Sequence, residues 1–250
     1  MTAYTKRLPK VTAVLCTAAL LAGCAAGTSD NTEPAATTAP VKAITIEPTA
    51  VYQTMNGFGA SACWWSQEVG NWENAKDILS LLYDENSGIG LNIYRYNLGA
   101  GSKDDATITD PDRRAEAFID KDGSYHWERD AAAQNALTLA KSMNKDLRVT
   151  LFSNSAPVFY TANGKAYCDY LPDDEKYVTN LEPERYADFA KYSIACAKHF
   201  TEAGYRVTGL SPINEPEWSW RGYEDGTAKQ EGCYYSKTQC RDLYKVFLKQ

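Results

Sequence analysis

The sequence predicts an α/β fold in which parallel strands alternate with helices. Three apolar, strand-like segments begin at residues 91, 147 and 207, and each gap between them holds a stretch with helical apolar spacing. Strands connected in this way form a parallel sheet with right-handed crossovers. The composition suits such a domain, because 44% of the 250 residues are hydrophobic and 23% are charged, an ordinary globular balance.

The expected elements follow in order along the chain. Short strands at residues 44–46 and 51–55 lead into a further strand at Gly57-Phe58-Gly59-Ala60-Ser61. Apolar spacing then predicts helix 74–83, strand 91–98, helix 129–143, strand 147–152, helix 183–203 and strand 207–213. Asn71 is a candidate N-cap of the first helix, and Gly204 ends the third. Ser236-Lys237-Thr238-Gln239 matches the capping-box pattern and opens a last helix.

The strand at 57–61 brings the number of βα units to four. A complete (β/α)8 barrel takes about 250 residues or more, whereas residues 41–250 supply about half of its units. The last helix also reaches Gln250 without a C-cap glycine or proline. We therefore expect residues 41–250 to be the N-terminal part of a barrel domain, in a chain that is cut short.

The first 23 residues have the pattern of a lipoprotein-type signal peptide. Basic residues between Lys6 and Lys10 precede an apolar run at 11–22, which is too short for a membrane span of about 20 apolar residues. Leu21-Ala22-Gly23-Cys24 resembles the bacterial lipobox, in which the cysteine thiol accepts a diacylglycerol. Cys24 is therefore the expected lipidation site, with plain secretion as the alternative.

Residues 24–40 are rich in alanine, threonine and proline and are expected to form a flexible tether. Together with Cys24 they predict a protein that is exported and anchored by lipid at the bacterial cell surface. The net charge of −6 argues against a nucleic-acid partner, which needs a basic face. Only two histidines and no Cys-x-x-Cys motif are present, so we expect no metal and no cofactor.

Cysteine pairing is left open by the sequence. Once Cys16 is removed with the signal and Cys24 is acylated, five cysteines remain. An odd number prevents complete pairing within the chain. The five are Cys63, Cys168, Cys196, Cys233 and Cys240.

Polar side chains lie at the ends of three predicted strands. Arg95 interrupts an apolar strand, Asn154 follows the next one, and Asn214-Glu215-Pro216 follows the last. In α/β barrels the reactive groups come from these carboxyl ends. A buried arginine needs a partner, and the expected partner is a carboxylate on an adjacent strand end.

Glu215 is the candidate acid of this site. Pro216 flanks it and Trp218 and Trp220 follow, so we expect the carboxyl to be partly desolvated. Desolvation raises a carboxyl pKa, as a general acid at neutral pH requires. The amide of Asn214 can donate to a hydroxyl of the sugar ring being cleaved. The alternative is that Glu215 is a salt-bridged residue at a strand end, because Asn-Glu-Pro alone is a weak motif.

Taken together, the segments resemble glycoside hydrolase family 30, within the clan A retaining glycosidases. QTMNGFGAS followed by Trp64-Trp65 is similar to the N-terminal signature of that family. YRYNLGAG, FSNSAP, SPINEPEWSW and QEGC are similar to its endo-β-1,6-galactanase-like branch. The resemblance covers residues 44–250 and implies a (β/α)8 barrel with an accessory β-sandwich, to which residues 44–51 contribute.

The resemblance also implies a role for each matching residue. Glu215 corresponds to the acid/base, Asn214 to the residue that binds the sugar 2-hydroxyl, and Arg95 to an arginine that supports a catalytic carboxylate. Four residues fall where the family lines its sugar cleft: Trp65, Asn154, Trp218 and Trp220.

The nucleophile of the family is a glutamate near the end of strand seven. This sequence has no strand seven. We therefore expect the 250 residues to be inactive alone. Glu231 is the local candidate to replace that glutamate, and loop capping is its more ordinary interpretation.

The expected partner is a β-linked polysaccharide or oligosaccharide, with a galactan preferred. Other specificities of the family remain open, namely β-glucosidase or glucosylceramidase-like, xylanase and β-1,6-glucanase. A surface lipoprotein that binds carbohydrate without cleaving it is the alternative from another functional class.

Overall fold

The computed structural model describes residues 44–173 and 176–250. The chain divides into two units, Met1–Tyr52 and Gln53–Gln250, and each is described by itself. The signal peptide, Cys24 and the tether lie outside the described residues. Within the first unit, residues 47–50 form a turn in which the Ala50 N–H donates to the Glu47 carbonyl at 3.1 Å.

The strands predicted at 44–46 and 51–55 are wrong, because the structure has no strand there. Ile44 and Ile46 are more than four-fifths exposed. A strand needs a hydrogen-bonded neighbour to be stable, and no described segment pairs with these residues. The contribution of residues 44–51 to an accessory sandwich stays a prediction.

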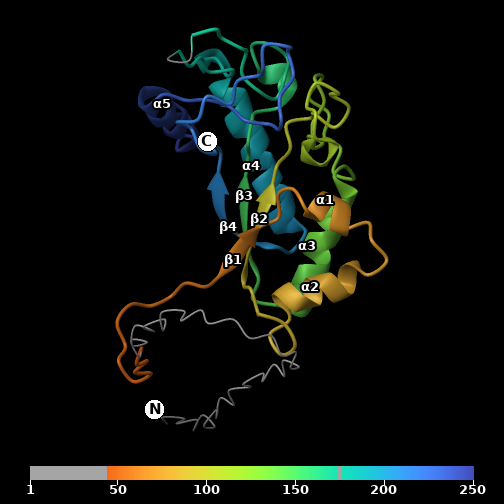
Figure 1. Cartoon of the computed structure of the whole chain (residues 1–250), viewed down its shortest axis with the longest axis vertical. Helices are drawn as coiled ribbons and strands as arrows, with labels where there is room; N and C mark the ends of the chain where they lie inside the picture. The colour runs from red at the N-terminus through yellow and green to blue at the C-terminus, as the bar shows by residue number, and fades with distance from the viewer. Residues whose placement is uncertain (1–43, 174–175) are drawn as a thin grey trace, which may run out of the picture. The chain divides into compact units, whose positions relative to one another are not determined.

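The second unit alternates strands and helices in the predicted order, with one short additional helix, α1 (Figure 1). The strands are β1 (Gly59–Ser61), β2 (Ile93–Asn97), β3 (Arg148–Phe152) and β4 (Arg206–Ser211). The α-helices are α1 (Ser66–Val69), α2 (Ala75–Tyr83), α3 (Ala131–Met143), α4 (Tyr186–Glu202) and α5 (Lys237–Phe247). Single 3-10 turns are η1 (Pro111–Arg113), η2 (Val158–Tyr160) and η3 (Pro183–Arg185).

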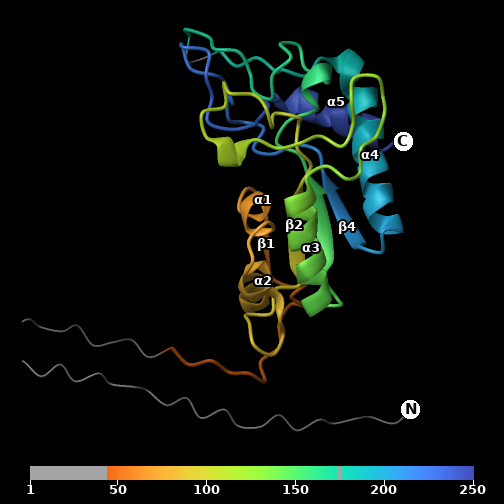
Figure 2. The same cartoon turned by 90° about the vertical axis from the view of Figure 1, so that its right-hand side faces the viewer.

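The four strands form one parallel sheet in the order β1-β2-β3-β4. Figure 1 shows their arrows pointing the same way, with the long connections after β2, β3 and β4 gathered at the end to which they point. In Figure 2, α1 and α2 lie beside α3, and α4 lies beside β4. The predicted α/β class and its four βα units are therefore confirmed.

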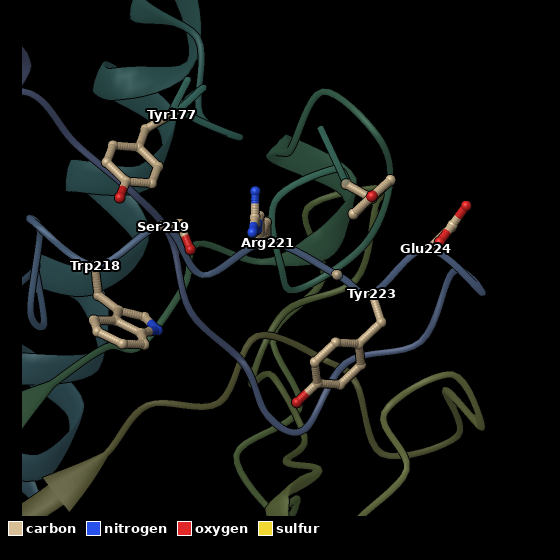
Figure 3. A pocket seen from close by; sticks show the side chains of 8 residues that line it. Tyr177, Trp218, Ser219, Arg221, Tyr223 and Glu224 are labelled. Carbon is tan, nitrogen blue, oxygen red and sulfur yellow. The ribbon is translucent and has the colours of Figure 1, made fainter. Parts of the chain in front are cut away.

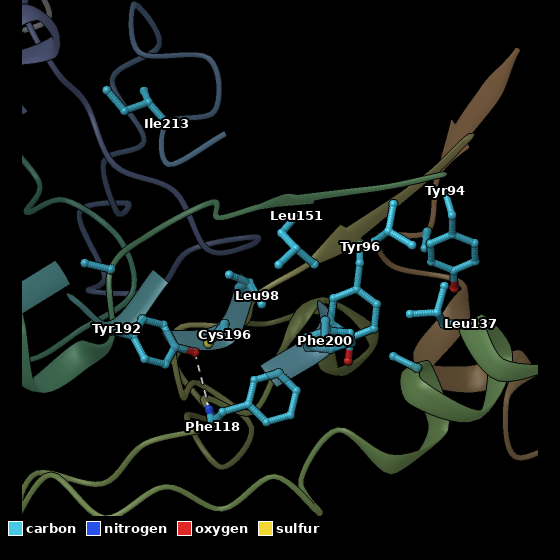
Figure 4. Packing of buried hydrophobic residues seen from close by; sticks show 14 of the residues in the cluster. Tyr94, Tyr96, Leu98, Phe118, Leu137, Leu151, Tyr192, Cys196, Phe200 and Ile213 are labelled. Carbon is cyan, nitrogen blue, oxygen red and sulfur yellow. Dashed lines mark hydrogen bonds between the residues drawn. The ribbon is translucent and has the colours of Figure 1, made fainter. Parts of the chain in front are cut away.

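The main core lies between one face of the sheet and the helices, and it is rich in aromatic side chains (Figure 4). Tyr94 and Tyr96 of β2 are fully buried. The ring of Tyr96 lies 4.9 Å from that of Phe200 in α4. Beside them, the Phe118 N–H donates to the Tyr192 hydroxyl at 3.3 Å. Rings at these separations add favourable edge and face contacts to the burial of apolar area.

The ends of several elements differ from the prediction by one to three residues. α2 begins after Asn74 rather than at a cap on Asn71. α3 begins at residue 131, because Asp130 has a left-handed backbone with φ of 53°. The segment predicted as helix 183–203 opens with the 3-10 turn η3 before α4 begins. β4 ends at Ser211, because Pro212 has no N–H to donate to a neighbouring strand.

The two predicted end signals are confirmed. α4 ends at Glu202, and Gly204, with a φ of 86°, follows its C-cap residue Ala203. α5 opens with a complete capping box. The Gln239 N–H donates to Ser236 Oγ at 3.3 Å, and the Ser236 N–H donates to Gln239 Oε1 at 2.9 Å.

Candidate active site

Alternation along β2 separates core residues from site residues. Successive side chains of a strand point to opposite faces of the sheet. Tyr94 and Tyr96 face the helices and join the core, so Arg95 and Asn97 share the other face. The register places Ser61 beside Arg95 and Phe152 beside Asn97. The face away from the helices therefore carries the polar groups of the candidate site.

Arg95 is held by neutral groups rather than by the carboxylate expected from the sequence. Its Nη2 donates to Asn214 Oδ1 at 2.8 Å, and its Nη1 donates to Ser61 Oγ at 3.3 Å. The guanidinium carbon lies 3.2 Å from the centre of the Phe152 ring, an arrangement that stabilises a cation over an aromatic face. Within the described residues no ion pair joins Arg95 to a carboxylate, so that prediction is wrong.

The charge of Arg95 nevertheless interacts with that of Glu215. Burial lowers the pKa of Arg95, and the negative charge of Glu215 acts in the opposite direction. Because a guanidinium stays protonated in proteins, the site keeps one fixed positive charge near Glu215. Arg95 therefore fixes the orientation of the Asn214 amide and also supplies a positive field.

Glu215 lies in the loop that follows β4, and its backbone is fixed by two hydrogen bonds. Its φ is 43°, and its carbonyl oxygen accepts from Trp218 N–H at 3.1 Å and from Trp220 Nε1 at 2.9 Å. Glu215 lines a cavity of about 450 Å³ with Pro216, Glu217 and Trp218. The loop therefore presents the carboxyl to an open space next to the Arg95–Asn214 pair.

The partial desolvation predicted for Glu215 is wrong, because the residue is exposed in the described chain. The two tryptophans that were expected to cover it do not enclose the carboxyl. Trp220 packs against Gly232, where an added Cβ would meet the indole at 2.3 Å, and Trp218 is itself 67% exposed.

Asn154 lies in a buried polar network at the ends of β2 and β3. Its Nδ2 donates to Asn97 Oδ1 at 3.0 Å and contacts Cys63 Sγ at 3.5 Å. Burial raises the pKa of the Cys63 thiol, so this group is neutral. The structure thus places Asn154 close to the sheet, and its predicted contact with sugar is untested.

The tryptophans differ in how much of each ring is free. Trp65 donates from Nε1 to the Ser61 carbonyl at 2.8 Å, and its ring lies 6.4 Å from that of Tyr94. Trp220 is half-buried. Trp218 is the tryptophan with the most exposed ring of the three, and it lines two further cavities besides that of Glu215.

The larger of these further cavities, about 560 Å³, lies between two loops (Figure 3). Tyr170 and Tyr177 come from the connection after β3, and Trp218, Arg221 and Tyr223 come from the connection after β4. Three tyrosines and a tryptophan therefore surround a space that shares Trp218 with the cavity of Glu215. Aromatic faces with polar tips suit a polar ligand that also has apolar surfaces.

Glu231 is an anchor of the loop after β4. It is fully buried, and its Oε1 accepts from Ala100 N–H at 3.0 Å and from Ser102 Oγ at 2.7 Å. Burial, followed by the charge of Asp130, raises the pKa of Glu231 to about 8 despite these bonds. The structure therefore supports the loop-capping interpretation, because an enclosed carboxyl cannot face Glu215 across a sugar.

Three residues of the site were given no role from the sequence: Ser61, Asn97 and Cys63. The spacing from Arg95 could have indicated Asn97, because side chains two residues apart on a strand point to the same face of the sheet. Across residues 44–173 and 176–250, no group of three or more His, Cys, Asp or Glu side chains is placed to hold a metal ion. The same residues include no helix that is long and apolar enough to cross a membrane.

Comparison with known proteins identifies the family. The model of O-glycosyl hydrolase family 30 matches residues 41–250, which is most of the chain. The chain belongs to this family. Its four βα units match part of the fold of a solved family 30 xylanase and of a solved endo-β-1,6-glucanase, each at 19% identity.

Two curated relatives are galactan-cleaving enzymes by name. The endo-β-1,6-galactanase of Hypocrea rufa is 30% identical over 218 residues, which cover 77% of this chain and 43% of that protein. The exo-β-1,6-galactobiohydrolase of Bifidobacterium longum is 27% identical over 242 residues, covering 72% of this chain and 16% of that protein. The chain thus spans less than half the length of either relative.

One solved structure is similar to this chain in sequence as well as in fold. A conserved exported protein from Bacteroides fragilis is 28% identical, with a TM-score of 0.72, and the match covers 82% of this chain and 42% of that one. The family 30 assignment and the galactanase-like resemblance inferred from the sequence are confirmed.

Proposed function

We propose that this chain is the acid/base-bearing part of a retaining glycoside hydrolase that cleaves β-1,6-linked galactan. The observation that carries the proposal is the position of Glu215. It follows a barrel strand, lines an open cavity and has the Arg95–Asn214 pair beside it. The support for galactan comes from the named activities of the two curated relatives.

In the proposed reaction Glu215 acts twice. It first protonates the glycosidic oxygen as the leaving sugar departs, and it then takes a proton from the attacking water. A retaining enzyme needs a second carboxylate about 5–5.5 Å away as the nucleophile. We place that carboxylate at the end of a seventh strand, beyond residue 250. The 250 residues alone are therefore inactive.

Asn214 and Arg95 position the sugar ring in this proposal. Arg95 occupies the amide oxygen of Asn214, so the amide nitrogen is left to donate to a ring hydroxyl. A donor that is fixed before the substrate binds loses little freedom in the transition state, which favours catalysis. Trp218 offers an exposed ring on which an apolar sugar face can stack.

We also propose that the protein is exported and held at the bacterial cell surface by a lipid on Cys24. The support is the basic and apolar leader, the Leu-Ala-Gly-Cys sequence and the tether at 24–40. In bacteria that make the protein, Cys24→Ser moves it from the membrane fraction to the soluble fraction and abolishes labelling with palmitate. Unchanged membrane association and labelling of that variant contradict the anchor.

The catalytic proposal is tested by Glu215→Gln in a protein that carries all eight strands. Hydrolysis is measured on β-1,6-galactan, β-1,6-glucan and xylan. We expect turnover on galactan only, and a loss of about 10²–10⁴-fold in kcat/KM in the variant, as removal of a general acid–base group gives. Glu202→Gln, at the end of α4, is the matched control and keeps full activity.

Full activity of Glu215→Gln removes the acid/base assignment. Preferred hydrolysis of glucan or xylan contradicts the galactan specificity and supports another specificity of the family. Binding of galactan without turnover in either protein favours the carbohydrate-binding lipoprotein.

A further inference from the structure

Two buried cysteines from different loops meet beside the candidate site. Cys168 belongs to the connection between β3 and α4, and Cys233 belongs to the connection between β4 and α5. Both are free thiols that are at least 98% buried, and the two side chains interact with each other. The Tyr234 N–H also donates to Cys168 Sγ at 3.4 Å, which places this sulfur against the backbone next to Cys233.

The backbones of the same two loops are already joined around this contact. The Cys168 N–H donates to the Trp220 carbonyl at 2.9 Å, and the Gly222 N–H donates to the Cys168 carbonyl at 2.8 Å. Nearby, the Gly232 N–H donates to the Ala166 carbonyl at 2.8 Å. The two sulfurs are therefore held together by surrounding structure on both sides.

We propose that Cys168 and Cys233 form a disulfide that links the loop after β3 to the loop after β4. A disulfide needs two sulfurs that can approach to about 2.05 Å without backbone movement, and the bonds that join the two loops around Cys168 and Cys233 bring these residues together. The pairing leaves Cys63, Cys196 and Cys240 as thiols. It does not depend on the proposed catalytic function.

The electrostatics of the pair favour the required thiol chemistry. Burial raises the pKa of Cys233, but the hydrogen bond from Cys168 and others, including one from Thr179, outweigh burial and lower it. Donating that bond raises the pKa of Cys168. Cys233 is therefore the more readily deprotonated thiol of the pair, and thiolates are the attacking species in disulfide exchange.

The oxidation proceeds by exchange with a disulfide oxidant, such as oxidised glutathione or the disulfide of a thiol oxidase. The Cys233 thiolate attacks one oxidant sulfur, forms a mixed disulfide and releases the first oxidant thiolate. Cys168 then loses its proton and attacks Cys233 Sγ, which releases the second. The two thiols of the chain give two electrons and two protons to the oxidant. Because both sulfurs are enclosed, the exchange takes place as the loops close during folding.

The disulfide fixes the two walls of the larger aromatic cavity (Figure 3). Tyr170 and Tyr177 stand in the loop of Cys168, and Trp218 and Tyr223 stand in the loop of Cys233. Connecting loops are in general more mobile than the strands and helices that they join. The link thus holds the exposed ring of Trp218 at a set distance from the opposite tyrosines.

Peptide mapping tests the pairing directly. The chain is unfolded in urea, refolded with oxidised and reduced glutathione, alkylated at free thiols and digested with trypsin without reductant. Cleavage after lysine and arginine gives peptides 166–176 with Cys168, 230–237 with Cys233, and 238–241 with Cys240. We expect 166–176 and 230–237 as one linked species that separates on reduction, with Cys240 alkylated. Alkylation of both Cys168 and Cys233, or linkage of either to peptide 238–241, overturns the proposal.

Thermal unfolding gives a second test, in which the Tm of each protein is compared with and without reductant. Reduction with dithiothreitol is expected to lower the Tm of the oxidised protein by about 5–10 °C, the shift that corresponds to loss of a typical disulfide in a domain of this size. Cys240→Ser keeps that shift. The double variant Cys168→Ser/Cys233→Ser has none. A wild-type Tm that does not respond to reductant contradicts the disulfide.

Discussion

At the scale of single residues, Glu231 shows how the fold sets the charge of a group that the reaction does not use. Burial raises the pKa of Glu231 to about 8 in the folded chain, against an ordinary value of 4.5. The folded state therefore takes up a proton near neutral pH. Stability from this group is fully present below pH 4.5 and is lost as the pH rises through about 8.

Glu231→Gln should flatten this dependence, because glutamine resembles the protonated acid and its Oε1 can still accept from Ala100 and Ser102. We expect the loss of unfolding free energy between pH 5 and pH 8 to shrink by on the order of 1–3 kcal/mol. Urea unfolding at a series of pH values measures it. The exposed Glu224→Gln serves as control and keeps the wild-type slope. If Glu231→Gln also keeps that slope, Glu231 is charged in the folded chain.

Arg95→Lys tests the support of Asn214. A lysine cannot stack as a plane on Phe152 while reaching both Ser61 and Asn214. In the protein with all eight strands we expect kcat to fall by about 10²-fold, the effect of misplacing a positioning group. The unfolding free energy should change by about 1 kcal/mol, measured by urea titration. Arg241→Lys on the outside of α5 is the control. Unchanged kcat in Arg95→Lys separates Arg95 from the reaction.

The strand-end rule found Arg95, Asn154, Asn214 and Glu215 from the sequence, because parallel strands bring their carboxyl ends together. It did not find what holds Arg95. The contacts with Ser61 and Phe152 depend on strand register, which a short apolar strand does not encode by itself. The exposure of Glu215 likewise depends on the orientation of two tryptophan rings. The left-handed backbone of Trp220 and the space above Gly232 set the position of one of them.

At the scale of elements, the helices and strands were predicted well in kind and less well at their ends. The capping box of α5 was readable, because it is encoded in four consecutive residues. The start of α3 was not readable, because Asp130 takes a left-handed conformation that tertiary bonds support. It accepts from the Tyr96 hydroxyl at 2.6 Å and donates to Glu116 at 2.7 Å. Local sequence patterns carry no information on such distant partners.

Ser236→Ala removes one half of the capping box of α5. We expect a loss of about 1 kcal/mol in unfolding free energy, the usual effect of losing a side-chain N-cap. Chemical denaturation followed by circular dichroism measures it. Ser236→Asp is the matched control, because aspartate also caps, and it should lose less than half as much. Equal loss in the two variants means that capping is not the reason.

Gly70 allows α1 to approach α3. An added Cβ would lie 1.8 Å from the carbonyl oxygen of Ala132, which is backbone and cannot move aside. The Gly70 carbonyl also accepts from Asn135 Nδ2 at 2.7 Å. We expect Gly70→Ala to lower the unfolding free energy by about 2–3 kcal/mol through steric overlap. The control Gly164→Ala has no atom within 4 Å of the added Cβ, although its positive φ adds a smaller strain. A Gly70→Ala variant as stable as wild type contradicts the close packing.

At the scale of the whole molecule, four parallel strands put the acid/base candidate at one end of the sheet and leave the nucleophile unassigned. The family match extends over residues 41–250, and the matched region is 43% of the Hypocrea rufa galactanase. The sequence predicted both the family and the number of βα units, because its motifs occur in order along the chain. The sugar could not be derived from these residues, since the rest of a barrel also shapes the pocket.

The 250-residue chain by itself should release no sugar from β-1,6-galactan, because one carboxyl cannot complete a double displacement. Reducing-sugar assays on the purified chain measure this, with the eight-strand protein as the positive control. Turnover by the chain alone means that a described carboxyl serves as the nucleophile.

The most direct test of the central claim asks whether Glu215 donates the proton to the leaving oxygen. Glu215→Gln and wild type, both with all eight strands, are compared on β-1,6-galactan and on a dinitrophenyl β-galactobioside, whose leaving group departs without protonation. We predict that the variant loses about 10²–10⁴-fold in kcat/KM on galactan and almost nothing on the aryl substrate. Azide added to the variant should react with the glycosyl-enzyme and give the β-glycosyl azide. An equal loss on both substrates, or none on galactan, contradicts the role of Glu215 as the acid/base.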